Sequence, residues 1–122
     1  MDARELRIGN YLKYNDGGIF KVTEILEFGL SVEDDIEETY MEYENFTPIE
    51  LTEDILVRLC NEEYSGLFYP ISGRCTIDLE NKNCNFYIDS NYSDVDIPMP
   101  KYLHLLQNLY WCLCGQELNF IL

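Results

Sequence analysis

The chain has 122 residues, of which 47% are hydrophobic, and this content excludes an intrinsically disordered protein. No apolar run approaches the roughly 20 residues that a transmembrane helix needs. The formal net charge of −15 disfavours ordinary binding to DNA or RNA, because an acidic surface repels phosphates, and it favours a partner with a basic surface.

Residues 6–51 predict a small antiparallel β unit. Four strand-like runs follow one another, at 11–14, 19–23, 28–33 and 40–44. Asp16 and Gly17 stand between the first two runs, and Asp-Gly is a strong hairpin signal because both residues tolerate positive φ. Several short, curved strands so close together indicate a small barrel or a strongly bent meander.

Residues 51–122 predict a mixture of helices and strands. Thr52 is suited to cap a short helix, because its hydroxyl can accept bonds from the free N–H groups of the first turn. Three strand-like runs come next, at 67–71, 75–79 and 84–88, and a polar loop and a long helix follow them. Alternating apolar residues over 118–122 predict a final strand.

The long helix is expected over residues 100–114, and the rest of the predicted fold is organised around it. Tyr102, Leu106, Leu109 and Leu113 share one stripe, at spacings of four, three and four. We expect sheets from both halves of the chain to cover this stripe.

These elements together predict an α+β fold. Its parts are a small antiparallel β-barrel-like unit, a helix, a three-stranded antiparallel meander, the long amphipathic helix and a final strand. We expect two lobes: residues 1–50 form the barrel-like lobe, and residues 51–122 form an α+β lobe packed on helix 100–114.

The opposite face of the long helix carries a tryptophan beside imidazole and amide groups. The residues are His104, Gln107, Asn108 and Trp111. One hypothesis is a partner-binding face, because Trp is enriched at interface hot spots. The alternative is a second packing face whose polar groups bond to neighbouring backbone, as buried polar groups nearly always do.

Acidic residues are concentrated in one part of the chain. Between Lys21 and Arg58 there are twelve acidic residues and no basic one. The densest cluster is Glu33, Asp34, Asp35, Glu37 and Glu38. This cluster is either an acidic surface that attracts a basic partner or a solvated loop that keeps the protein soluble.

Metal and cofactor motifs are not found, and we expect neither a metal nor a cofactor. Cys112 and Cys114 are two apart on a helix, so they point to different faces and cannot jointly bind a metal. A loop over 89–96 begins like a calcium loop, but Pro100 stands where its bidentate glutamate is needed. The odd number of cysteines and the charged N-terminus predict a reducing, cytoplasmic location.

Two segments resemble a known family. Leu6–Tyr11, with the sequence LRIGNY, and Leu103–Tyr110, with the sequence LHLLQNLY, are similar to segments of a family of small uncharacterised proteins. That family is common in Bacteroidetes genomes and in their phages or mobile elements. The resemblance implies a bacterial or phage cytoplasm, and it implies no reaction and no catalytic residue.

We therefore expect a non-enzymatic interaction protein of a bacterium or of its phages or mobile elements. A first alternative is an acidic inhibitor that mimics nucleic acid and occupies the basic groove of a host or defence protein. A second alternative is a small carboxylate-dependent hydrolase, although no positioned acid, base or nucleophile can be named from the sequence. The expected partner is a protein with a basic surface rather than a nucleic acid or a membrane.

Overall fold

The structure is a computed structural model that describes residues 3–34, 36–59, 68–72, 75–87 and 94–118. The chain divides into two compact units: unit 1 is Met1–Glu50 with Tyr102–Asn108, and unit 2 is Leu51–Lys101 with Leu109–Leu122. The prediction assigned the whole long helix to the second lobe. The first half of this helix instead belongs to unit 1, because its side chains bond to the N-terminal segment.

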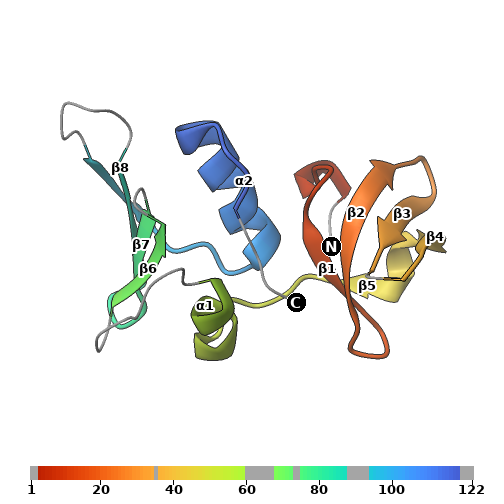
Figure 1. Cartoon of the computed structure of the whole chain (residues 1–122), viewed down its shortest axis with the longest axis horizontal. Helices are drawn as coiled ribbons and strands as arrows, with labels where there is room; N and C mark the ends of the chain where they lie inside the picture. Colours follow the sequence, from red (N-terminus) through yellow and green to blue (C-terminus); the bar gives the residue numbers. More distant parts are fainter. Residues whose placement is uncertain (1–2, 35, 60–67, 73–74, 88–93, 119–122) are drawn as a thin grey trace. The chain divides into compact units, whose positions relative to one another are not determined.

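Unit 1 is built on a curled five-stranded antiparallel sheet in the order β4-β3-β2-β1-β5 (Figure 1). Its strands are β1 Tyr11–Tyr14, β2 Ile19–Ile25, β3 Gly29–Glu33, β4 Glu38–Glu42 and β5 Phe46–Thr47. Two 3-10 turns accompany them, η1 at Ala3–Glu5 and η2 at Tyr43–Asn45. The sheet forms a half-barrel, which confirms the barrel-like unit expected from the sequence.

The core of unit 1 lies on the inner face of this sheet. Its buried residues are Leu6, Leu12, Val22, Leu30, Val32 and Phe46. The ring of Tyr14 meets Phe20 and Phe46 edge-on, with centroids 6.1 and 5.9 Å apart. Leu30 and Val32 therefore point inward from β3, as the period-two pattern predicted. Phe28, the first residue of the predicted run, instead precedes the strand and is exposed.

The predicted Asp-Gly hairpin joins β1 to β2. Gly17 has φ +94°, which a residue with a side chain adopts only with strain. The carboxylate of Asp16 accepts a bond from the Gly18 N–H at 2.8 Å, and the Gly18 carbonyl accepts one from Tyr14. These bonds fix the register in which Leu12 pairs with Phe20.

Unit 2 contains a four-stranded antiparallel sheet in the order β6-β7-β8-β9. Its elements are α1 Glu53–Leu59, β6 Phe68–Ser72, β7 Cys75–Asp78, β8 Asn83–Tyr87 and β9 Asp94–Pro98. Helix α2, Leu103–Cys114, begins in unit 1 and ends in unit 2. Neither helix within the described ranges has the length and apolar character to cross a membrane.

The predicted three-stranded meander has a fourth strand. The sequence predicted a polar loop through residue 96, whereas Asp94–Pro98 pairs with β8 along its whole length. The amide of Asn85 donates to the carboxylate of Asp96 at 2.9 Å, so a polar side chain supports the pairing. The predicted final strand over 118–122 lies outside the described residues except for Leu118, which is buried but is not part of a strand. The start of the calcium-like loop also lies outside the described residues.

The buried stripe of α2 is rotated relative to the prediction. Its fully or almost fully buried apolar residues are Leu103, Leu106, Tyr110 and Cys114. Tyr102, Leu109 and Leu113, which the prediction placed on the stripe, are only half-buried. The predicted helical period was correct. The buried face differs from the predicted stripe because the hydrogen-bonded polar side chains of His104 and Gln107 also occupy buried positions.

Gly29 leaves room for β4 to approach. A Cβ there would clash with the Met41 carbonyl oxygen and would lie 2.8 Å from the ring of Tyr40. We expect Gly29→Ala to lower the free energy of unfolding by about 1–3 kcal/mol, measured by urea denaturation, because backbone atoms must move. The control is Ser31→Ala on the same strand, and equal stability of both variants would contradict this close approach.

Candidate functional site

The side chain of Gln107 on α2 bonds to the backbone of the N-terminal segment at two places. Its Nε2 donates to the Gly9 carbonyl at 2.9 Å, and its Oε1 accepts from the Tyr11 N–H at 2.9 Å. The side chain is 1% exposed. The side-chain amide of Gln107 therefore satisfies one backbone acceptor and one backbone donor at the start of β1. A neighbouring β-strand would satisfy the same two groups with its own backbone.

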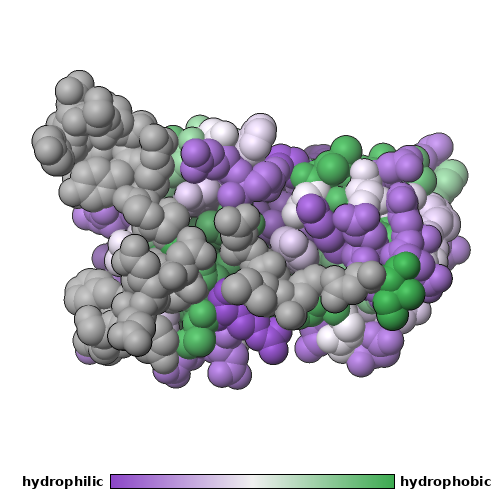
Figure 2. Space-filling model, viewed as in Figure 1, coloured by the Kyte–Doolittle hydropathy of each residue, from purple (hydrophilic) through white to green (hydrophobic). Residues whose placement is uncertain are grey.

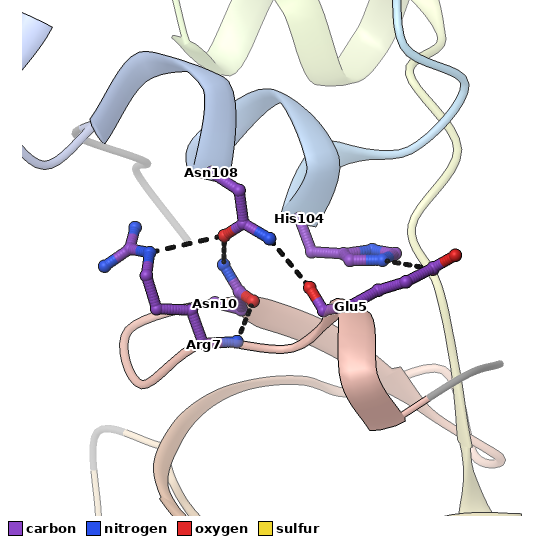
Figure 3. A network of polar contacts seen from close by, with 5 residues as sticks. All are labelled: Glu5, Arg7, Asn10, His104 and Asn108. Atoms are coloured by element: carbon purple, nitrogen blue, oxygen red, sulfur yellow. Dashed lines mark hydrogen bonds and ion pairs between the residues drawn. The ribbon is translucent and has the colours of Figure 1, made fainter. Parts of the chain in front are cut away.

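Asn108, the next residue on α2, continues this contact (Figure 3). Its Nδ2 donates to the Glu5 carbonyl at 2.7 Å, and its Oδ1 accepts from Asn10 Nδ2 at 2.9 Å and from Arg7 Nε at 3.3 Å. Together, the bonds of Gln107 and Asn108 to residues 5–11 form the amide contact. All members of the contact lie in unit 1.

The N-terminal side of the amide contact is a tight turn. The Asn10 N–H donates to the Arg7 carbonyl at 3.0 Å, and Asn10 Oδ1 accepts from the Arg7 N–H at 2.6 Å. Gly9 has φ +98°, a conformation that favours glycine. Glu5, Arg7 and Asn10 were not predicted as partners of α2. Most of the contact lies within Leu6–Tyr11 and Leu103–Tyr110, the two segments on which the predicted family resemblance rests.

His104 is fully buried and bonds to the same segment (Figure 3). Its Nε2 lies 3.3 Å from the Glu5 carboxylate, and its ring stacks on Tyr102 with centroids 5.9 Å apart. Nδ1 is buried without a hydrogen-bond partner among the described residues. Burial lowers the pKa of His104, and the bond and charge of Glu5 oppose this shift only in part.

The structure separates the four residues that were predicted to form a partner-binding face. His104 and Gln107 are buried, Asn108 is half-buried, and Trp111 alone is exposed, at 44%. The polar groups of Gln107 and Asn108 bond to backbone, as the alternative of a second packing face proposed. Binding of a partner by Trp111 stays a prediction.

The predicted acidic cluster lies at the hairpin between β3 and β4. Glu33 pairs across the sheet with Glu38, and Glu37 is exposed; Asp35 is outside the described residues. Asp34 closes the turn, because its carboxylate accepts from the N–H groups of Glu37 and Ile36. These two bonds lower the pKa of Asp34.

Acidic side chains share the outer face of the sheet next to this hairpin. Residues directly opposite in an antiparallel pair point to the same face. The outer face of β2–β4 therefore carries Glu24, Glu33, Glu38, Glu42 and Tyr40, because Glu24 and Tyr40 both pair with Ser31. It also carries one basic side chain of β2, Lys21, which pairs with Glu33. Tyr40 is 50% exposed.

A shallow hollow adjoins the end of β4. Its lining residues are Phe28, Glu42, Tyr43 and Glu44. Phe28 is 73% exposed, and the Tyr43 hydroxyl donates to the Leu26 carbonyl, which holds its ring on the hairpin between β2 and β3. The hollow combines two aromatic rings with two carboxylates, a combination that suits a cationic group.

The described residues offer little support for a catalytic or metal site. Within these ranges no group of three His, Cys, Asp or Glu residues is placed to hold a metal ion. The shifted carboxyl pKa values are those of Asp34 and Asp78, and both are lowered, whereas a general acid needs a raised pKa. Burial raises the pKa of the Cys75 thiol, and it raises that of Cys84 to about 12, so both favour the unreactive thiol.

Comparisons with protein families, with curated proteins and with solved structures found no match. The resemblance of Leu6–Tyr11 and Leu103–Tyr110 to a bacterial family therefore stays a prediction. The candidate functional surface is therefore defined by geometry, and it consists of the outer face of β2–β4 and the hollow beside Phe28.

Gln107→Leu tests the amide contact. The substitution leaves the Gly9 carbonyl and the Tyr11 N–H without their partner, and each unpaired buried group costs about 1–3 kcal/mol. We expect the free energy of unfolding, measured in urea, to fall by about 2 kcal/mol or more. The matched control is Gln116→Leu at an exposed position, and a loss no larger than that of the control would contradict the contact.

The pH dependence of stability tests the burial of His104. Its folded pKa is lowered, so the unfolded chain binds the proton more readily. The free energy of unfolding should therefore fall as the pH drops below the ordinary histidine pKa of 6.5, and this loss should stop below the folded pKa. We expect the difference between wild type and His104→Gln to show this trend between about pH 8 and pH 5, whereas a pH-independent difference would contradict it.

Proposed function

We propose that this chain is a non-enzymatic interaction protein of a bacterium or of its phages or mobile elements, and that it acts in the cytoplasm. Its partner is a protein with a basic surface, and the outer face of β2–β4 receives it. The observation that carries the proposal is the grouping of Glu24, Glu33, Glu38 and Glu42 on one face of a sheet, beside the exposed rings of Tyr40 and Phe28.

The physical reason is the combination of charge with exposed apolar surface. Clustered carboxylates raise the rate of encounter with a basic protein, while desolvated aromatic rings supply most of the affinity of an interface. In the space-filling view, hydrophilic and hydrophobic residues lie side by side over the sheet of unit 1 (Figure 2). A surface that served solubility alone would gain nothing from Phe28 being 73% exposed.

The acidic nucleic-acid mimic is retained as a second candidate. It is supported by the same carboxylates, because they are held on one face of a paired sheet rather than on a disordered loop. A mimic would compete with nucleic acid for its partner. Duplex DNA should therefore displace the chain from a captured partner if this candidate is correct, and it should have no effect if the partner uses a surface that does not bind nucleic acid.

Affinity capture from a lysate of a Bacteroidetes host tests the proposal. We expect the wild-type chain to retain one or more basic proteins, which elute between about 0.1 M and 0.5 M salt because screening weakens charge pairing. The double variant Glu38→Lys/Glu42→Lys should recover at most a tenth as much, a loss of about 1.4 kcal/mol. Recovery is measured by quantitative mass spectrometry.

The matched control is Glu50→Lys/Glu80→Lys, which makes the same change of net charge at two other exposed positions. Equal recovery by the wild type and by both double variants would remove the β2–β4 face from the proposal.

A third variant, Trp111→Ala, examines the remaining exposed residue of the predicted helix face. Full recovery with this variant would exclude Trp111 as a contact.

A further inference from the structure

Within the described residues, strand β4 is a sheet edge that has neither the short length nor the proline that protects other edges, and its charged side chains are both acidic. The other sheet edges among the described residues are β5, β6 and β9. β5 has two residues, β6 contains Pro70, and β9 ends at Pro98. β4 has five residues and no proline, and no further strand in the described part of the chain pairs with it. Short strands and prolines prevent edge pairing, so β4 is the edge best able to accept another strand.

The backbone groups of β4 that face this edge can be assigned. The Asp34 N–H bonds to the Glu37 carbonyl at 3.1 Å, and hydrogen-bonded and non-hydrogen-bonded pairs alternate along an antiparallel ladder. Glu38, Tyr40 and Glu42 therefore occupy non-hydrogen-bonded pairs with β3, and their N–H and C=O groups point away from β3.

A second observation agrees with this assignment. The Gly29 carbonyl accepts from the Leu26 N–H at 2.9 Å, so the backbone of Gly29 faces β2 rather than β4. Gly29 is the partner of Glu42 on β4. This pair must then be non-hydrogen-bonded, which again directs the Glu42 backbone groups to the open edge.

The same three residues place their side chains on one face. Glu38, Tyr40 and Glu42 alternate with half-buried Thr39 and Met41 along β4. A strand added at this edge would set alternate side chains directly beside Glu38, Tyr40 and Glu42. One carboxylate lies on each side of the Tyr40 ring along the strand. The added strand should therefore carry a basic residue, an apolar residue and a second basic residue at alternate positions.

The hollow beyond Glu42 refines this pattern. Phe28 and Tyr43 supply aromatic rings, and Glu42 and Glu44 supply carboxylates. A guanidinium group can stack on an aromatic ring and pair with a carboxylate at the same time, whereas an ammonium group is a compact, strongly hydrated charge. Arginine is therefore favoured over lysine beside Glu42.

We propose, on the basis of the proposed function, that β4 binds its partner by strand addition: an extended segment with an arginine, an apolar residue and a basic residue at alternate positions pairs with Glu38–Glu42.

A second copy of this chain is not the occupant. Two β4 strands paired antiparallel about Tyr40 would set Glu38 against Glu42, and like charges directly opposite are destabilising.

Synthetic peptides test this pairing with the whole chain unchanged. The probe has the sequence Thr-Arg-Thr-Val-Thr-Arg-Thr with blocked ends. The probe is expected to pair antiparallel to β4 with its valine opposite Tyr40. Its valine N–H should then face β4, and the N–H of the threonine before the valine should face away. We expect N-methylation of the valine to weaken binding about tenfold or more, whereas N-methylation of that threonine changes it less than about threefold. Binding is measured by calorimetry.

Amide hydrogen exchange gives the second measurement. The unmodified peptide should slow exchange at the N–H groups of Glu38, Tyr40 and Glu42, and it should leave those of Lys13 and Thr47 at the opposite side of the sheet unchanged. Replacing both arginines of the peptide by lysine should weaken binding about threefold or more.

The outcomes separate the two proposals. Equal binding of both N-methylated peptides, or no slowed exchange along β4, overturns strand addition. If the unmodified peptide does not bind but lysate capture still depends on Glu38 and Glu42, strand addition is again overturned while the proposed function stands. If neither peptide binding nor capture depends on these carboxylates, both proposals fail.

Discussion

The structure of unit 1 depends on one constraint: the backbone at the entry to β1 must find hydrogen-bond partners away from water. The Gly9 carbonyl and the Tyr11 N–H find theirs in a single buried side chain, Gln107. Buried polar groups without partners cost more than ordinary hydrogen bonds gain, so this requirement is stringent. It fixes which face of α2 points at residues 5–11, and the amide of Asn108 then follows one residue later.

This constraint explains why the polar face of α2 is not free for a partner. His104, Gln107 and Asn108 looked like a recognition surface in the sequence, yet their polar groups serve the fold of unit 1. The outer face of β2–β4 carries four carboxylates and the half-exposed ring of Tyr40, and we propose that a partner binds there. The residues that stabilise unit 1 and those of the proposed partner surface are therefore different sets.

The sequence predicted those features that local patterns determine. The hairpin at Gly17, the alternating strands of the half-barrel and the helical period of α2 all follow from short-range rules. β9 was missed because its pairing with β8 outweighs a weakly apolar, acid-rich pattern. The amide contact joins residues about a hundred positions apart, and no local pattern indicates such a bond.

The candidate site was predictable only in part. Charge clustering located the acidic hairpin, but the face shared by Glu24, Glu38 and Glu42 depends on the register of three strands and on the bulge between Val22 and Glu24. The predicted family resemblance rests on Leu6–Tyr11 and Leu103–Tyr110, and it gave no indication that the two segments contact each other. These two segments bond to each other, so their residue types are explained by the fold of unit 1 before any partner is considered.

A double-mutant cycle between Asn10 and Asn108 tests the amide contact most directly. Free energies of unfolding are measured for the wild type, Asn10→Ala, Asn108→Ala and the double variant. Because the two side chains bond to each other at 2.9 Å, we expect a coupling energy of about 1 kcal/mol or more. Strictly additive losses, with a coupling energy near zero, would contradict the account, since they would mean that α2 and the N-terminal turn do not meet at these residues.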